Sequence, residues 1–278
     1  MIGEDPTREE YDAFKQFLES ACGILLGDNK QYLVKSRLRK IMEEEKIDTL
    51  GHLIDKLQAS FRGNLRETVI DAMTTNETLW FRDTHPFRIL QEKIFPEYSG
   101  RNTGQPLKIW SAACSTGQEP YSIAMVADEH KRLKPGELRG GISVVATDIS
   151  KRVLDNAKSG TYEMLAIGRG LSKERQDRYF CKTADGSWQI SRELQRSIDF
   201  RELNLLDRYT GLGRFDVIFC RNVLIYFSAD LKRDIIGRMH ASLNPGGYLI
   251  LGASESLNNL PDKYEMVHCN PGIIYRAK

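Results

Sequence analysis

The sequence lacks the features that mark several large classes of protein. No apolar run approaches the length that spans a membrane, and the first residues are polar and acidic where a secretory signal is basic and then apolar. The five cysteines are scattered and odd in number, which argues against a disulfide framework. The five histidines lack the spacing of metal ligands. We therefore expect a cytoplasmic protein with reduced thiols and no bound metal.

An excess of one charge is also lacking. The 40 Lys and Arg residues nearly balance the 38 Asp and Glu residues, for a formal net charge of +2. A near-neutral chain has no overall field that recruits nucleic acid or a membrane surface, so recognition by charge must come from a local patch. With 278 residues, 41% of them apolar, the chain is long enough for two domains with ordinary cores.

The first part of the chain predicts helices alone. Thr7 and Glu10 have the spacing of a capping box, and apolar residues recur at helical intervals after them. A second helix is expected over residues 28–45, and a later one after Asn64, whose spacing to Glu67 repeats the cap signal. We expect no strand before residue 105.

The helix expected over residues 28–45 carries a local basic patch. Outside its apolar stripe lie five cations with no acid among them: Lys30, Lys35, Arg37, Arg39 and Lys40. One interpretation is a solvated outer face, for which Lys and Arg are the usual residues. The other is a docking surface for an acidic partner, which raises the encounter rate in a salt-dependent way.

From residue 105 onward, strands alternate with helices, as in a parallel sheet with crossover helices. Strands are expected at residues 107–110, 142–146, 198–200, 215–219 and 248–251, followed by an antiparallel pair at 266–268 and 273–276. Residues 160–197 interrupt the alternation, with a helix expected at 171–180 and a hairpin around Asp185 and Gly186. We expect a small inserted β-subdomain there, which covers a site or offers a sheet edge to a peptide.

Residues 107–123 have the strand, small-residue loop and helix start of a nucleotide-type cradle. Gly117 can take the backbone angles of a sharp turn, and N–H groups at a helix start favour an anionic group. A phosphate loop needs a lysine after its last glycine, whereas Gln118 and Glu119 follow here. A negative charge at this point suits a ligand with a cation, such as S-adenosylmethionine. Taken alone, the stretch also fits an ordinary turn between a strand and a helix.

Other strand ends carry polar residues that a ligand would meet. Asp148 is placed to accept hydrogen bonds from ribose hydroxyls or to cap the next helix, and Asn204 to bond an adenine edge. Arg221 and Asn222 end the most apolar strand and face the crevice of an open α/β sheet. Residues 74–83 lead from hydrogen-bonding side chains into aromatics, which fits a lid over a ligand or a capped linker.

Five stretches, in order along nearly the whole chain, resemble the CheR family of chemotaxis receptor methyltransferases. They are TTNETLWFRD, SAACSTGQEPYSIAM, ATDIS, FDVIFCRNVLIYF and LNPGGYLILGASES. The resemblance implies an α/β, Rossmann-like S-adenosylmethionine-dependent methyltransferase domain over residues 91–278, with a β-subdomain inserted at about 171–197. It places an all-α, receptor-facing N-terminal domain at residues 1–76 and a linker that contributes to the cofactor site at 77–90.

The same resemblance implies an activity and a set of site residues. Family members transfer the methyl group of S-adenosylmethionine to glutamate side chains on the cytoplasmic helices of chemoreceptors, giving methyl esters and S-adenosylhomocysteine for sensory adaptation. Glu119 would meet the methionyl ammonium, Asp148 the ribose diol, and Tyr226 would orient the acceptor carboxylate near the methyl group. The remaining cofactor residues would be Asn76, Thr78, Arg82, Asn204, Leu205, Arg221 and Asn222. Receptor docking would fall to Lys35, Arg37, Arg39 and Lys40.

The chain departs from the family pattern at the inserted hairpin. Some members hold a C-terminal receptor peptide through a longer, glycine-bearing loop, whereas the tip here is only residues 183–187. This favours a member that does not depend on such a tether.

The expected chemistry is simple. A glutamate carboxylate, with a pKa of about 4.3, is ionised at neutral pH and attacks a sulfonium methyl without a general base. We expect a monomer. Two alternatives stay open, namely a methyltransferase of this fold with another acceptor and a cofactor-binding signalling module without turnover.

Overall fold

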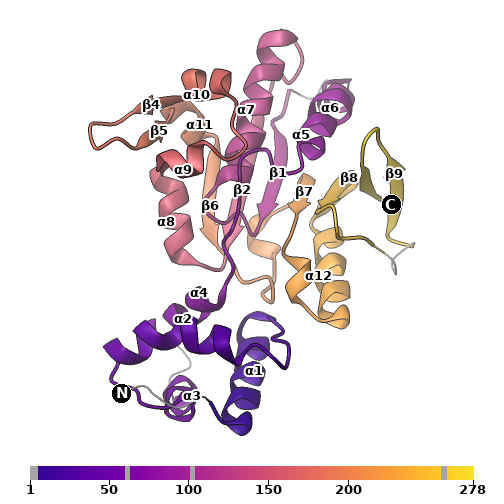
Figure 1. The fold of residues 1–278 in the computed structure, drawn as a ribbon. Coiled ribbons are helices and arrows are strands. Elements are labelled where there is room, and N and C mark those ends of the chain that lie inside the picture. The colour runs from indigo at the N-terminus through magenta and orange to yellow at the C-terminus, as the bar shows by residue number, and fades with distance from the viewer. Residues whose placement is uncertain (1–5, 60–62, 101–103, 258–261) are drawn as a thin grey trace.

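The computed structural model describes residues 6–59, 63–100, 104–257 and 262–278. Figure 1 shows a helical lobe at the N-terminal end below a larger lobe of strands and helices. The helical lobe consists of α1 (Arg8–Cys22), α2 (Gln31–Glu44), α3 (Leu50–Ala59) and α4 (Asn64–Met73). Its buried residues form a hydrophobic core of their own, and the described residues contain no strand before residue 107.

The beginnings of these helices agree with the sequence predictions only in part. The Thr7–Glu10 capping box is confirmed, with both of its side-chain to backbone bonds present. The cap predicted at Asn64 is wrong, because Gly63 precedes the first turn and Asn64 is already helical. The second helix begins at Gln31 rather than at residue 28. The carboxylate of Asp28 instead accepts a hydrogen bond of 2.6 Å from the ammonium of Lys15 on α1.

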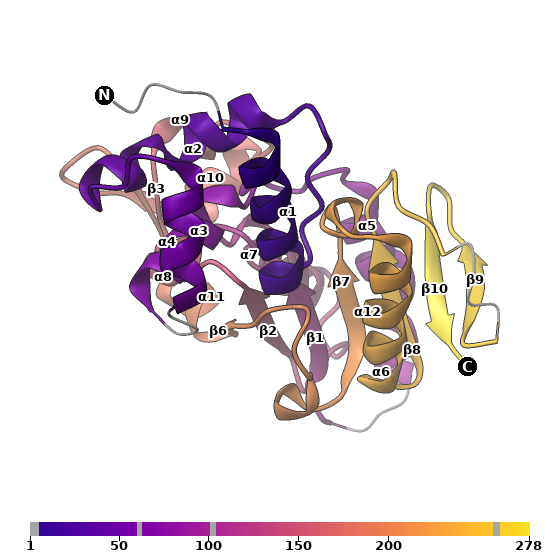
Figure 2. The ribbon, with the colours of Figure 1, turned by 90° about the horizontal axis from the view of Figure 1, so that it is seen from below.

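The larger lobe is built on a seven-stranded sheet with the order β6-β2-β1-β7-β8-β10-β9, which Figure 2 shows from one edge to the other. Its strands are β1 (Leu107–Ala112), β2 (Ile142–Asp148), β6 (Ile198–Glu202), β7 (Phe215–Cys220), β8 (Leu243–Leu251), β9 (Tyr264–His268) and β10 (Ile273–Ala277). The first five in this order are parallel, and β10 runs antiparallel to both of its neighbours. The predicted parallel sheet with a terminal antiparallel pair is therefore confirmed.

Helices cover both faces of the sheet because its central strands are apolar on both sides. In β7, Val217 and Phe219 join the core shared with α7, whereas Ile218 joins the core shared with α12. The helices of this lobe are α5 (His85–Ile89), the π-helical η1 (Leu90–Ile94), α6 (Phe95–Gly100), α7 (Gln118–Leu133), α8 (Lys151–Ser159) and α12 (Ala229–Ala241), with the 3-10 turns η2 (Thr210–Leu212) and η3 (Leu224–Tyr226). None of the described helices has the length and apolar character needed to cross a membrane.

The inserted segment forms a second, three-stranded sheet. Its elements are β3 (Thr161–Tyr162), α9 (Met164–Ile167), α10 (Lys173–Tyr179), β4 (Phe180–Lys182), β5 (Trp188–Ile190) and α11 (Arg192–Arg196). The strand order is β3-β5-β4, so this sheet includes residues before 171. Trp80 packs edge-on against Tyr162 and Phe180, with ring centroids 4.9 and 5.4 Å away, and so joins the insertion to the linker.

The two lobes meet at the carboxyl ends of the parallel strands. The N–H of Leu25, between α1 and α2, donates to the carbonyl of Tyr226 at 2.9 Å. Farther along the same edge, Arg152 of α8 pairs with Asp71 of α4 at 2.7 Å. The helical lobe is thus placed to close one side of the crevice in which open α/β sheets bind their ligands.

Candidate active site

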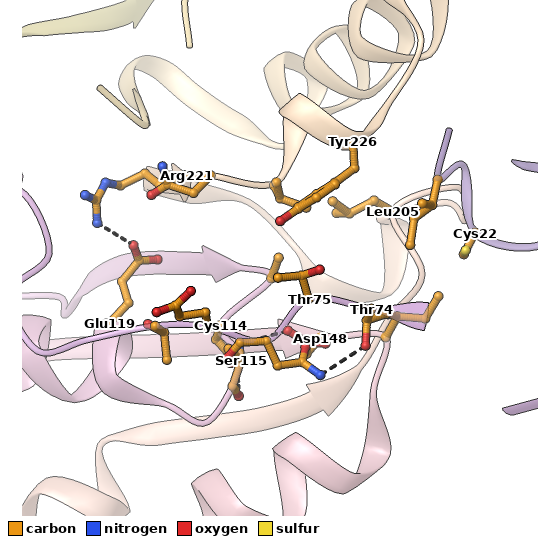
Figure 3. A pocket seen from close by; sticks show the side chains of 18 of the residues that line it. Cys22, Thr74, Thr75, Cys114, Ser115, Glu119, Asp148, Leu205, Arg221 and Tyr226 are labelled. Carbon is orange, nitrogen blue, oxygen red and sulfur yellow. Dashed lines mark hydrogen bonds and ion pairs between the residues drawn. The ribbon is translucent and has the colours of Figure 1, made fainter. Parts of the chain in front are cut away.

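A pocket with about 1040 Å³ of empty space, open to solvent, lies between the two lobes. Its floor comes from the loops that follow β1, β2 and β7, and its opposite wall comes from the linker after α4 and the end of α1. The order β2-β1-β7 makes β1 and β7 the point where the chain switches direction across the sheet, which is the usual ligand position in this fold class. Figure 3 shows side chains from both lobes directed into this space.

All of the residues predicted to bind cofactor or to act in catalysis line this one pocket. They are Asn76, Thr78, Arg82, Glu119, Asp148, Asn204, Leu205, Arg221, Asn222 and Tyr226. The structure thus brings together residues spread over 150 positions of the sequence, and their individual roles remain predictions.

The loop after β1 takes a sharply left-handed path. Gly117 has a φ of +93°, and an added Cβ would lie 2.9 Å from the Cβ of Ala157. Ala113 and Ser115 also have positive φ values, of 58° and 51°, which cost energy for residues with a side chain. Asn222, across the pocket, has a φ of 59°. Such backbone conformations gather at ligand sites, where the surrounding structure enforces them.

An ion-pair group centred on the buried Arg221 lies at one end of the pocket. The guanidinium of Arg221, with only 2% of its side chain exposed, contacts Glu119 at 2.9 Å and Asp83 at 2.7 Å. The other oxygen of Glu119 accepts a hydrogen bond of 2.7 Å from the hydroxyl of Ser111. With two carboxylates and one guanidinium, the group carries a net negative charge, so a cationic ligand group such as an ammonium complements it.

Asp148 ends β2 on the pocket floor. Its two carboxylate oxygens accept backbone N–H groups from Ser115 at 2.8 Å and from Ser150 at 3.0 Å. Ser150, and not Asp148, is the N-cap of α8, which removes the helix-cap role considered for the acid. Burial raises the pKa of Asp148 above its usual value, although these N–H groups act in the opposite direction. Asp148 is therefore a fixed, buried acceptor, as a ribose diol requires.

The linker contributes both a pocket wall and a core anchor. The Asn76 amide donates to the hydroxyl of Thr74 at 3.0 Å, and the Asn76 carbonyl accepts from Ser115 at 2.8 Å. Farther along the linker, Trp80 and Phe81 are buried. The first half of residues 74–83 therefore lines the pocket, which fits the lid interpretation, and the aromatic residues of the second half pack in the core, which fits the capped-linker interpretation.

Asn204 lies where the two lobes meet. Its amide nitrogen donates to the carbonyl of Ala21 at 2.8 Å, and its amide oxygen accepts from the N–H of Leu206 at 3.0 Å. The side chain therefore joins α1 to the loop after β6, in addition to lining the pocket next to Leu205. Contact with an adenine edge remains a prediction for this residue.

Tyr226 ends η3 and projects toward the centre of the pocket (Figure 3). Its backbone is held, because its carbonyl accepts from Leu25, and Figure 3 draws no hydrogen bond between its hydroxyl and the other residues shown. Asn222 is held by its N–H, which donates to Glu255 at 2.8 Å. The hydroxyl of Tyr226 is thus a polar group available to a ligand.

The predicted docking residues lie on α2, outside the pocket. Arg39 and Lys40 are largely exposed and pair with Glu43 and Glu44, one turn along the same helix. Arg37 is different, because its guanidinium donates to backbone carbonyls at the end of α4.

Three residues at or beside the pocket were not predicted individually. Asp83 and Ser111, which do not line the pocket, complete the contacts of the ion-pair group, and Ser115, which does, supports Asp148. Ser111 lies near the end of β1 and Ser115 in the small-residue loop after it, where polar residues at a strand end were a usable signal. Asp83 depends on a turn with a φ of 64°, which no sequence pattern indicated.

Two cysteines also line the pocket. Burial raises the pKa of the Cys22 thiol to about 11 and that of Cys114 well above its usual value. Both stay neutral near pH 7 and serve as small apolar walls. Within the described parts of the chain, no cluster of His, Cys, Asp and Glu could hold a metal ion.

Comparison with known proteins gives a consistent result. The family model described as the CheR methyltransferase all-alpha domain matches residues 9–74, and the one described as the CheR methyltransferase SAM binding domain matches residues 76–273. The chain is 58% identical over 269 residues to a chemotaxis protein methyltransferase of Pseudomonas putida and, equally, to chemotaxis protein methyltransferase 1 of Pseudomonas aeruginosa. Both alignments cover 97% of this chain and 98% of the relative. A chemotaxis protein methyltransferase of Escherichia coli is 34% identical over 255 residues, which are 90% of this chain and 85% of that relative.

Proposed function

The chain belongs to the CheR methyltransferase family, and we propose that it methylates glutamate side chains of chemoreceptors. It is an S-adenosylmethionine-dependent chemotaxis methyltransferase with an α/β, Rossmann-like fold and an all-α N-terminal domain. The glutamate acceptor, its location on the cytoplasmic helices of a receptor and action as a monomer are the proposed parts. The observation that carries the proposal is the pocket itself, which brings the buried carboxylate of Asp148 and the partly buried carboxylate of Glu119 together with an open tyrosine hydroxyl.

Each of the two carboxylates would bind a different part of the cofactor. Glu119, in its net negative group with Arg221 and Asp83, would hold the methionyl ammonium. Asp148 would accept the ribose hydroxyls, since its oxygens are already oriented by two backbone N–H groups. Asn76, Thr78, Arg82, Asn204, Leu205 and Asn222 would complete the cofactor site. When bound, S-adenosylmethionine supplies an electrophilic methyl group beside a positive sulfur.

The site must orient the glutamate that accepts the methyl group, but it need not remove a proton from it. A glutamate carboxylate is ionised at neutral pH, so the site must align it and exclude water around it. The Tyr226 hydroxyl, which makes no hydrogen bond to the pocket residues drawn in Figure 3, would donate a hydrogen bond to one carboxylate oxygen and leave the other to react. Residues from both lobes surround this point, which limits the access of water.

The basic surface of α2 would guide the receptor to the pocket. Arg39 and Lys40 have 72% and 84% of their side chains exposed. Exposed cations attract a partner that carries glutamates and raise its association rate at low salt. Lys35 would extend this surface along the helix.

The test is methyl transfer from methyl-labelled S-adenosylmethionine to purified cytoplasmic fragments of candidate receptors. We expect label on the receptor that is released as methanol in base, because glutamate methyl esters are base-labile, and that disappears when the acceptor glutamates are changed to alanine. Label that resists base would indicate another acceptor. Tight binding of S-adenosylhomocysteine without transfer, even in a single-turnover assay with every receptor fragment, would instead indicate a signalling module.

A further inference from the structure

The five cations of the basic stretch do not share one environment. Arg39 and Lys40 point along α2 to acids on the same helix, at 2.9 and 3.7 Å. Arg37 leaves the helix and reaches the segment that follows α4. One guanidinium nitrogen donates to the carbonyls of Met73 at 2.7 Å and Thr74 at 3.0 Å. The other donates to the hydroxyl of Thr75 at 3.1 Å.

These acceptors are groups that need a partner. Met73 is the last residue of α4 and Thr74 its C-cap, so their carbonyls have no acceptor role inside the helix. A cation at a helix C-terminus is also favoured by the helix dipole. A planar guanidinium can serve three acceptors together, which a lysine ammonium at the same position cannot do with equal geometry.

The contacted segment is a wall of the cofactor pocket. Met73, Thr74, Thr75 and Asn76 all line it, and Figure 3 shows Thr74 and Thr75 there, close to Asp148. Arg37 itself does not line the pocket. Arg37 can therefore affect a bound cofactor only by holding the wall residues that it contacts.

The far side of the same segment is tied to the loops that orient Asp148. The carbonyl of Asn76 accepts from Ser115, whose N–H donates to Asp148. The carboxylate of Asp71 accepts from the hydroxyl of Ser150, whose N–H also donates to Asp148. Residues 71–76 thus span from Arg37 on α2 to both backbone supports of the predicted ribose acceptor.

We infer that Arg37 is a positioning residue of the cofactor pocket, which holds the wall formed by residues 73–76 against the loops around Asp148. It shares the basic helix with the docking residues but serves cofactor binding. The inference concerns the binding of cofactor and does not depend on which acceptor is methylated.

The test is calorimetric binding of S-adenosylhomocysteine to the full chain and to three variants. Arg37→Ala should weaken binding about tenfold or more, while Arg39→Ala, the matched control on the same helix, should stay within about twofold of the unchanged chain. Arg37→Lys keeps the charge but not the planar fork, and it should bind with an affinity between those of Arg37→Ala and the unchanged chain. Hydrogen exchange should show faster exchange of the residue 74–79 amides in Arg37→Ala, with α1 and α3 unaffected.

Two results would overturn the inference. One is unchanged affinity for S-adenosylhomocysteine in Arg37→Ala. The other is full affinity in Arg37→Lys, which would mean that charge alone matters. If Arg37→Ala does not fold, as judged by circular dichroism, Arg37→Lys decides the matter by itself.

Discussion

Asp148 shows how the fold prepares a single side chain before any ligand arrives. Both of its oxygens are fixed by N–H groups from loops that follow different strands, Ser115 after β1 and Ser150 after β2. Burial raises its pKa, so the carboxylate is held at a cost that the backbone bonds partly offset. A buried acid kept in this state is typical of a binding site and unusual in a core.

Replacing this carboxylate should affect cofactor binding directly. Asp148→Ala should weaken the affinity for S-adenosylhomocysteine more than about tenfold, because a hydrogen bond to a charged group contributes about 1.5–3 kcal/mol. Titration calorimetry measures the change. Asp155→Ala, in α8 and outside this pocket, is the control. An affinity equal to that of the unchanged chain would remove Asp148 from the ribose site.

Tyr226 should act on the acceptor and not on the cofactor. Tyr226→Phe removes only the hydroxyl, which makes no hydrogen bond to the pocket residues drawn in Figure 3, so thermal stability should change little. We expect kcat for receptor methylation to fall roughly tenfold or more from the loss of one orienting hydrogen bond, with unchanged affinity for S-adenosylhomocysteine. A parallel loss of cofactor affinity would place the hydroxyl on the cofactor instead.

At the scale of elements, α2 combines three tasks on three faces. Its apolar stripe, with Val34 and Leu38, is buried in the core of the helical lobe. Arg37 reaches the end of α4, and Arg39 and Lys40 remain at the surface. A periodicity argument separates the buried face from the rest, but it cannot separate a cation that contacts another element from one that meets solvent.

Charge reversal at the exposed face tests docking without disturbing the pocket wall. In Arg39→Glu/Lys40→Glu, the KM for receptor should rise several-fold to tenfold, and the rise should shrink as salt is added because exposed charges are screened. Affinity for S-adenosylhomocysteine should stay constant, since neither residue contacts the wall. Reversal of the exposed Arg8 on α1 is the matched control. A salt-independent rise, or an equal one in the control, would argue against docking at α2.

Sequence patterns predicted most of the helices and strands, but they located fewer of the residues at which these elements begin or end. Strong apolar runs such as β7 were predicted nearly to the residue, because a central parallel strand needs apolar side chains on both faces. The two-residue β3 gave no signal, since a strand that short has no periodicity. The predicted cap at Asn64 failed because Gly63, with its extended backbone, takes the N-cap position.

At the scale of the whole molecule, the pocket exists only because two lobes with separate cores meet. Asp148, at the end of β2, and Glu119, in the first turn of α7 after β1, could be assigned to one site from sequence, because the carboxyl ends of parallel strands share an edge. The contributions of Cys22 and Thr75 could not, since no local pattern tells how a separately folded helical lobe docks on a sheet. The same limit explains why the contact between Asn204 and α1 was not foreseen.

The short strands of the inserted sheet affect how the whole protein can bind a receptor peptide. Its outer strands, β3 and β4, have only two and three residues, so either edge offers few backbone groups to an added peptide strand. The hairpin tip is closed on itself, because the N–H of Thr183 donates to the carbonyl of Ser187 at 2.8 Å.

We therefore expect methylation that does not depend on the receptor's C-terminal residues. Removing the last five or so residues of a receptor that is a substrate should change kcat/KM for methylation by less than about twofold. The edge is too short to supply the effective concentration that a second binding site gives, which typically raises apparent affinity by about a hundredfold or more. Initial rates measured over a range of receptor concentrations provide the comparison. The variant Cys181→Ala, in β4, checks whether this sheet edge contacts the receptor in another way. A large loss on truncation, reversed by restoring the tail, would show that the short sheet holds a peptide after all.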